Sequence, residues 1–272
     1  MLGLRQLHRS SPRYTGLAVL LAIAALPVAI ALAIDTRLYQ GIPVWIKPLK
    51  FLLSFVLYLL TLAWASRHAA AAVTSRPWWH WHERAVVLAV LAEVAWIAGA
   101  AALGTGSHFN VTSLPTGVLY GTMGFAAVVL TSATATMAFA VARARGPGLS
   151  PALRAGVVWG LGLTLPLTLL TAGTLAAQAN HWVGGTPSDA AGLWPMGWSR
   201  DGGDLRVPHF FATHAMQGVP ALAWLIARWR GPAAVGRVRA AAVLYTAFVL
   251  HTFVQALGGQ PFAAMIGGIA RG

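Results

Sequence analysis

The chain has 272 residues, of which 57% are hydrophobic and 9% charged, and its mean hydropathy is +0.67. A soluble domain carries about 25% charged residues, so this composition excludes an ordinary water-soluble globular protein and favours the lipid bilayer as its surroundings. Cysteine is absent, which excludes disulfides, iron–sulfur clusters and thiolate zinc sites. The formal net charge of +13 is a property often seen in nucleic-acid-binding proteins, but the positions of the charges described below explain it without nucleic acid.

Seven apolar runs are long enough to cross a bilayer as α-helices, which takes about 20 residues each. They cover residues 16–34, 48–66, 85–103, 117–142, 155–178, 208–227 and 240–257. The predicted fold class is all-α, a polytopic membrane helix bundle of about seven transmembrane helices. We expect a basic N-terminal segment (1–15), a single transmembrane domain (16–257) and a short C-terminal tail (258–272).

The first run follows a basic segment and loosely resembles a signal peptide. Its ~18 apolar residues exceed the 7–15 typical of a signal-peptide core. We therefore predict a retained helix. Cleavage is the alternative, and it would leave six spans with the same orientation.

Basic residues concentrate in one alternating set of connections, which predicts the orientation because cytoplasmic loops are rich in Lys and Arg. Thirteen of the 19 basic residues belong to this set: Arg5, Arg9, Arg13, Arg67, Arg76, Arg84, Arg143, Arg145, Arg154, Arg228, Arg230, Arg237 and Arg239. The N-terminus is thus predicted inside and the C-terminus outside.

Five of the nine histidines fall in the predicted outer half of the bundle or just above it. Polar groups at that depth are costly in hydrocarbon and usually face the protein interior or a water-filled cavity. His108, His181 and His209 form an upper layer, and His214 and His251 form a deeper one. Glu93, predicted to be the only acid within a span, lies ~15 Å below the outer end of the third helix. A buried carboxylate costs several kcal/mol unless paired or protonated, so Glu93 is the candidate catalytic or proton-carrying residue.

Helical spacing connects the deeper histidines to two glutamines. Gln217 follows His214 by three residues and Gln255 follows His251 by four, so each pair shares a helix face. The leading hypothesis is haem b held between His214 and His251, with an electron-transfer or redox role. In the cofactor-binding set we include Gln217, Gln255, Lys47 and Lys50, because the two lysines at the outer mouth of the second span would anchor an anionic group.

Two other functions remain open. A third alternative is that the protein binds no cofactor at all. One of the two functions is a proton-coupled transporter or permease in which Glu93 titrates and a threonine stripe on the fifth span, residues 164–178, lines the path. The other is a lipid-active metalloenzyme with zinc or copper held by His108, His181 and His209. The expected partners are the lipid bilayer and a quinone or another membrane small molecule.

Three motifs support a further comparison: W-x-K-P-x-K-F from Trp45 to Phe51, S-H-F-N from Ser107 to Asn110, and G-D-L-R-x-P-H-F…H-x-x-Q from Gly203 to Gln217. In these motifs the chain resembles a family of bacterial multi-pass membrane proteins. The resemblance implies a bacterial inner-membrane setting, and it implies no reaction or ligand.

Overall fold

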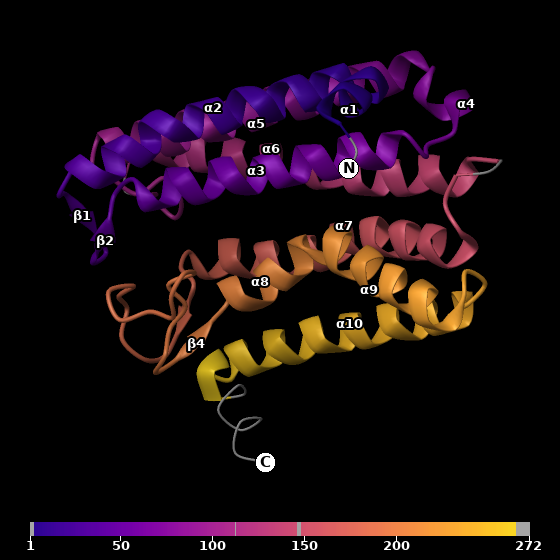
Figure 1. The fold of residues 1–272 in the computed structure, drawn as a ribbon. Coiled ribbons are helices and arrows are strands. Elements are labelled where there is room, and N and C mark those ends of the chain that lie inside the picture. Colours follow the sequence, from indigo (N-terminus) through magenta and orange to yellow (C-terminus); the bar gives the residue numbers. More distant parts are fainter. Residues whose placement is uncertain (1–2, 112, 146–147, 265–272) are drawn as a thin grey trace.

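The computed structural model describes residues 3–111, 113–145 and 148–264. The fold is all-α, as predicted, with two short β-hairpins (Figure 1). The helices are α1 (Leu4–Ser10), α2 (Pro12–Ile34), α3 (Ile46–Ser66), α4 (Ala71–Thr74), α5 (Pro77–Ala102), α6 (Leu114–Arg143), α7 (Pro151–Gln178), α8 (Arg206–Thr213), α9 (Ala215–Arg230) and α10 (Val235–Leu257). Strand β1 (Leu38–Tyr39) pairs antiparallel with β2 (Ile42–Pro43), and β3 (Trp182–Val183) pairs antiparallel with β4 (Gly203–Asp204).

Within the described residues, six helices are long and apolar enough to cross a membrane: α2, α3, α5, α6, α7 and α10. The pair α8–α9 satisfies the same criteria only as a unit, and it is bent by 57° at the junction of the two helices. The described residues therefore contain six candidate spans, or the seven predicted if the bent pair α8–α9 is one span. Of the predicted tail, residues 265–272 lie outside the described residues.

The third span begins earlier than predicted. Helix α5 starts at Pro77 rather than at residue 85, because proline suits the first position of a helix, where its missing N–H costs nothing. The earlier start places Glu83 within α5, where it is buried and ion-paired with Arg13. The prediction that Glu93 is the only acid within a span is therefore wrong.

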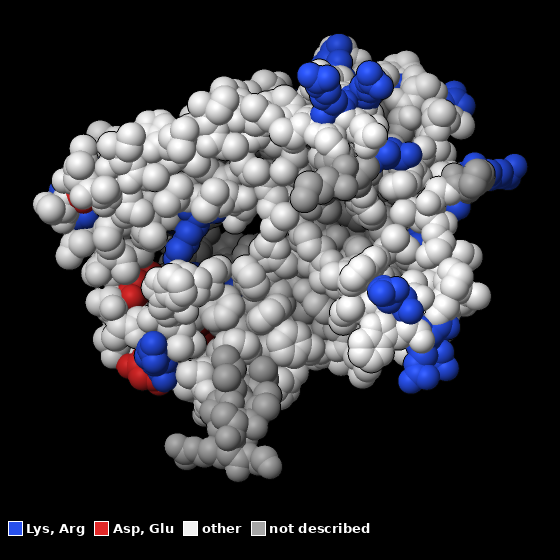
Figure 2. All heavy atoms as spheres, viewed as in Figure 1, with Lys and Arg blue, Asp and Glu red and all other residues white. Residues whose placement is uncertain are grey.

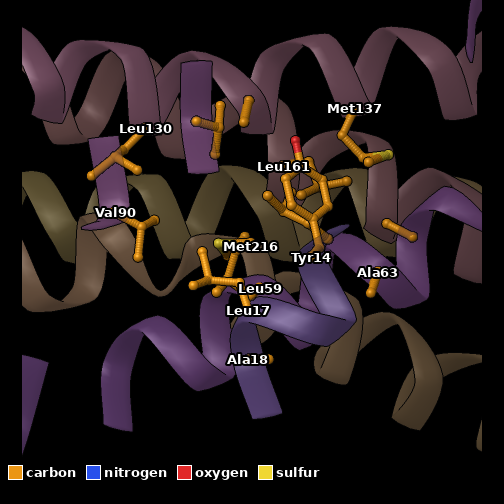
Figure 3. Packing of buried hydrophobic residues seen from close by; sticks show 14 of the residues in the cluster. Tyr14, Leu17, Ala18, Leu59, Ala63, Val90, Leu130, Met137, Leu161 and Met216 are labelled. Atoms are coloured by element: carbon orange, nitrogen blue, oxygen red, sulfur yellow. The ribbon is translucent and has the colours of Figure 1, made fainter. Parts of the chain in front are cut away.

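The helices form two groups (Figure 1). The first helix group contains α2, α3, α5 and α6, and the second contains α7, α8, α9 and α10. Closely packed backbone contact between the groups runs along α6 and α7. Figure 3 shows the main apolar core, which lies within the first group and which Leu161 of α7 and Met216 of α9 join from the second.

Within the second group, α7 and α9 approach closely at two glycines of α7. A Cβ at Gly156 would lie 2.2 Å from the Cβ of Ala223, and one at Gly160 would lie 2.8 Å from the carbonyl oxygen of Ala215. Small residues spaced four apart let membrane helices pack backbone against backbone. This contact fixes the position of the broken span against α7.

The two ends of the bundle differ in charge. Both β-hairpins lie at one end, here called the hairpin end (Figure 1). Figure 2 shows Lys and Arg clusters at the opposite end, here called the arginine-rich end, and Asp and Glu side chains at the hairpin end. The alternation of basic connections found in the sequence thus corresponds to two physical ends of one bundle.

Candidate functional site between the two helix groups

The broken span places His214 at the junction of α8 and α9. His214 has φ −88° and ψ 6°, outside the regular helical range, while its N–H still donates to the carbonyl of Phe210 at 3.0 Å. Just before the break, the hydroxyl of Thr213 donates to the carbonyls of His209 and Phe210. Such bonds from a threonine side chain to the preceding turn bend helices. The apolar pattern of the segment continues through the break, so hydropathy alone predicted an unbroken helix.

A chain of hydrogen bonds runs from the break to the first helix group. The Nδ1 of His214 lies 3.2 Å from Oε1 of Gln217, and because the amide oxygen only accepts, the histidine donates. The Nε2 of Gln217 then donates to the hydroxyl oxygen of Thr61 on α3 at 3.1 Å. The prediction that His214 and Gln217 share one helix face is therefore confirmed.

His209 contacts the threonine stripe of α7. Its Nδ1 lies 3.1 Å from the hydroxyl of Thr171. Thr164, Thr168 and Thr171 are buried, as expected for a stripe that faces the interior. Among the described residues, the hydroxyl oxygen of Thr168 is a fully enclosed atom without a hydrogen-bond partner.

His108, in the connection between α5 and α6, lies near the same region. Burial lowers its pKa well below the ordinary value, and the nearby Lys47 ammonium and His209 act in the same direction. The Nδ1 of His108 lies 3.0 Å from the hydroxyl of Ser107, and its ring packs near that of Phe51. His108 is therefore neutral at neutral pH and contributes hydrogen-bonding atoms rather than charge.

Glu93 and Lys47 bring opposite charges into the region between the groups. Lys47, in the first turn of α3, lies within electrostatic range of Glu93, Asp189 and Arg206. Glu93 is only 4% exposed, and it forms no hydrogen bond or ion pair with any residue that the structure describes. Its carboxylate oxygens are nevertheless not among the fully enclosed unpaired atoms of the described chain, so a small part of their surface is accessible. Each of the other five acids has a hydrogen-bonded partner.

An ion-pair network holds the loop between α7 and α8 (residues 179–205). Arg206 donates to Asp189 at 2.7 Å and to Asp204 at 2.7 Å, and Nε2 of His181 lies 3.3 Å from Asp189. Burial by itself would raise the pKa of Asp189, but hydrogen bonds and charge from His181 and Arg206 outweigh burial and hold it below its ordinary value. Asp204 and Arg206, two positions apart in the chain, thus form an ion pair.

The α7–α8 loop also reaches the first helix group. The backbone N–H of Asp189 donates to the carbonyl of Gln40 at 3.2 Å, and Nζ of Lys50 donates to the carbonyl of Met196 at 3.1 Å. Figure 2 shows the surface hollowed between the two groups, with a Lys or Arg side chain within the hollow. The loop thus connects the two groups across the hairpin end.

Replacing Asp189 by asparagine is expected to loosen this loop. A buried hydrogen bond to a charged group contributes about 2 kcal/mol, so the free energy of local opening should fall by about that amount, and trypsin should cut at the exposed Arg200 roughly 30-fold faster. In the wild type the lowered pKa means that this stabilisation is present above pH 3.8 and is lost as pH falls through the lower folded-state value. Pro187→Ala, an exposed change in the same loop, is the control, and equal cleavage of the two variants would contradict the role of Asp189.

The proposed haem ligands do not face each other in the structure. The buried face of α10 is defined by Val249, Thr252 and Ala256, and His251 lies on the exposed side of that helix. Gln255 donates to the carbonyl of Pro261 instead of to His251. Haem between His214 and His251 stays a prediction that this placement does not support. An optical spectrum of purified protein decides it, since bound haem gives a Soret band.

The predicted metal ligands are likewise divided among different partners. His108 contacts Ser107, His181 contacts Asp189, and His209 contacts Thr171. Across the described ranges of the chain, no group of three or more His, Cys, Asp or Glu side chains is arranged to hold a metal ion.

The fold and the site define the class of the protein: an α-helical, multi-pass integral membrane protein with a polar region between two helix groups. No protein-family model matches the chain, and neither a curated protein nor a solved structure matches it.

Proposed function

We propose that the protein is a proton-coupled transporter whose substrate passes between the two helix groups. The observation that carries this proposal is the broken span α8–α9, whose break at His214 lies beside the interface of the groups. Broken membrane helices line substrate and ion sites in transporters, since irregular backbone at membrane depth is tolerated where it borders a cavity or other protein. Hydrogen bonds from the break reach Thr61 of the first group through Gln217.

Glu93 is the proton carrier in this proposal. It is buried without a hydrogen-bond partner among the described residues, and a small part of the surface of its oxygens is accessible. A carboxylate in that setting gains from binding a proton or a cationic group, which is the property that couples proton movement to substrate binding. Lys47 supplies a positive charge within electrostatic range, so a change in the charge of Glu93 changes the field at the hairpin end.

The contacts of the α7–α8 loop support a closed state at the hairpin end. Asp189 and Lys50 connect the groups there, and breaking these contacts is the simplest way to open that end. The basic connections favour a cytoplasmic location for the arginine-rich end, and a bacterial inner membrane is the setting we propose. A substrate would then alternate between access from the two sides as the groups move.

Proteoliposomes with a trapped pH-sensitive dye test this function. Organic acids, sugars, amino acids and bilayer-soluble alcohols are added in turn, and a substrate is recognised by proton movement faster than in protein-free vesicles. We expect a response to one class of compound that His214→Ala weakens and Glu93→Gln removes. Vesicles that respond to none of the classes, or a response that Glu93→Gln leaves unchanged, would overturn the proposal.

A further inference from the structure

A groove opens between α3 and α9, farther along α3 than the charged residues of the hairpin end. It has a volume of about 310 Å³ and is lined by Leu60, Thr61, Trp64, Met216, Gln217 and Pro220. This volume is at the lower end of the range found for small-molecule sites, about 300–1,000 Å³. Both helices that form the groove are parts of candidate membrane spans, and the groove is open rather than enclosed. An open groove at that depth is accessible to a molecule dissolved in the bilayer.

The polar side chains Thr61 and Gln217 lie next to each other in the groove. Thr61 donates its hydroxyl hydrogen to the carbonyl of Leu57 at 2.7 Å and accepts from Gln217. The amide of Gln217 has two N–H groups, of which the second has no partner among the described residues. His214 lies outside the lining of the groove, and its Nδ1–H holds the amide oxygen of Gln217. Gln217 thus brings a free hydrogen-bond donor to a mostly apolar space.

The remaining walls are apolar and adaptable. Leu60 and Trp64 are half-buried on α3, and Met216 and Pro220 come from α9. Methionine fills irregular spaces because its side chain is flexible and polarisable. Because Pro220 has no N–H, the carbonyl of Met216 lacks its usual helical donor, which adds an acceptor to this side of the groove.

We infer that this groove binds an uncharged amphipathic molecule that enters from the bilayer. The oxygen of its hydroxyl or carbonyl head accepts from the free N–H of Gln217, and its apolar chain lies against Leu60 and Trp64. An occupant drawn from hydrocarbon must be largely apolar, and the only hydrogen-bonding groups of the groove are uncharged, which disfavours an ionic head. The inference rests on the proposed transport function in one respect, since it names the substrate class of that transporter.

Photolabelling of the whole protein in nanodiscs tests the inference. The probes are a fatty alcohol with a diazirine in its chain and the matching diazirine alkane without the hydroxyl. We expect the alcohol to label Leu60, Trp64 and Met216 more strongly than the alkane does. Gln217→Leu removes one hydrogen bond, which lowers labelling by the alcohol about 3- to 10-fold and leaves labelling by the alkane unchanged.

Two tryptophan variants of α3 make the test specific to the groove. Leu60→Trp fills it and should remove labelling, whereas Leu53→Trp, at a position 55% exposed on the same helix, should not. Labelling spread evenly over the exposed faces of α3, or equal labelling by both probes, would show an ordinary lipid contact and overturn the inference.

Labelling needs no proton gradient, so the two proposals fail separately. Specific labelling without proton-coupled transport would support the binding site and exclude the transporter. Proton-coupled transport of a sugar or amino acid with no groove labelling would support the transporter and exclude the groove as a binding site.

Discussion

Replacing Glu93 by glutamine is expected to abolish proton-coupled transport and to leave the protein folded. Glutamine keeps the shape of the side chain and removes the proton that the carboxylate exchanges. The carboxylate is buried without a hydrogen-bonded partner among the described residues, so it contributes little to stability as a charge. Removing it should leave the free energy of unfolding unchanged or raise it by about 1 kcal/mol. Transport in vesicles and thermal unfolding in detergent measure the two effects.

Glu83→Gln is the matched control, because Glu83 lies in the same helix and is also buried. Its carboxylate is ion-paired with Arg13 and accepts from the hydroxyl of Ser11. Here the free energy of unfolding should fall by about 1–3 kcal/mol, while the transport rate per folded molecule should not change. A Glu93→Gln protein that unfolds more readily than Glu83→Gln, or that still transports, would show that Glu93 has a structural role instead.

The second large effect is expected at Gly160 of α7. A Cβ there would lie 2.7 Å from Cδ of Pro220 and 2.8 Å from the carbonyl oxygen of Ala215, and neither atom can move without shifting α9. Gly160→Ala should therefore destabilise the protein by about 1–3 kcal/mol, the cost of overpacking. Gly160→Leu should prevent correct packing of the broken span. Thermal unfolding and the yield of monodisperse protein in detergent measure these effects.

Gly162→Ala controls for the change in helix propensity. It lies on the same helix, where a Cβ would meet the side chain of Ala138 at an ordinary 3.9 Å. Since alanine favours a helix more than glycine does, by about 1 kcal/mol, this variant should be neutral or stabilised. If Gly160→Ala behaved in the same way, the close contact of α7 with α9 would be excluded as a source of stability.

Much of the fold could be predicted from the sequence because the bilayer imposes a simple requirement. An apolar run of sufficient length must be a helix, since its backbone groups find no water. The break at His214 could not be predicted, because the apolar pattern continues through it and because threonines with the same bond to the preceding turn, such as Thr61 and Thr171, lie in unbroken helices. Glycine spacing alone does not identify a packing contact either, since a Cβ at Gly117, Gly121 or Gly124 of α6 would meet nothing within 4 Å.

The sequence predicted how far along each helix the candidate site residues lie, but not which face of each helix turns toward the interior. Helical spacing correctly paired His214 with Gln217, because residues three apart share a face in any helix. Spacing cannot say which face of α10 turns inward, and His251 lies on the outer one. The partner of Glu83 was missed because Arg13 precedes it by 70 positions and belongs to a different helix.

Motifs that are far apart in the chain meet at the hairpin end. The ring of Phe51 in the first motif lies 5.6 Å from that of His108 in the second, centroid to centroid, and Lys47 of the first motif is within electrostatic range of His108. The third contains Arg206 and His209. Their polar residues thus combine to close one end of the bundle and to surround the space between the groups.

The contact of α6 with α7 has a mechanical consequence. It lies behind the plane in which α3 and α9 form the groove (Figure 1). If the two groups rotate as rigid bodies about this contact, the rotation axis runs parallel to α6 and α7 along one edge of the molecule. Displacement then grows with distance from that edge, so a small rotation at α6 and α7 separates the opposite edge most. A few degrees there would widen the opening of the groove and pull Asp189 away from Gln40 in the same movement.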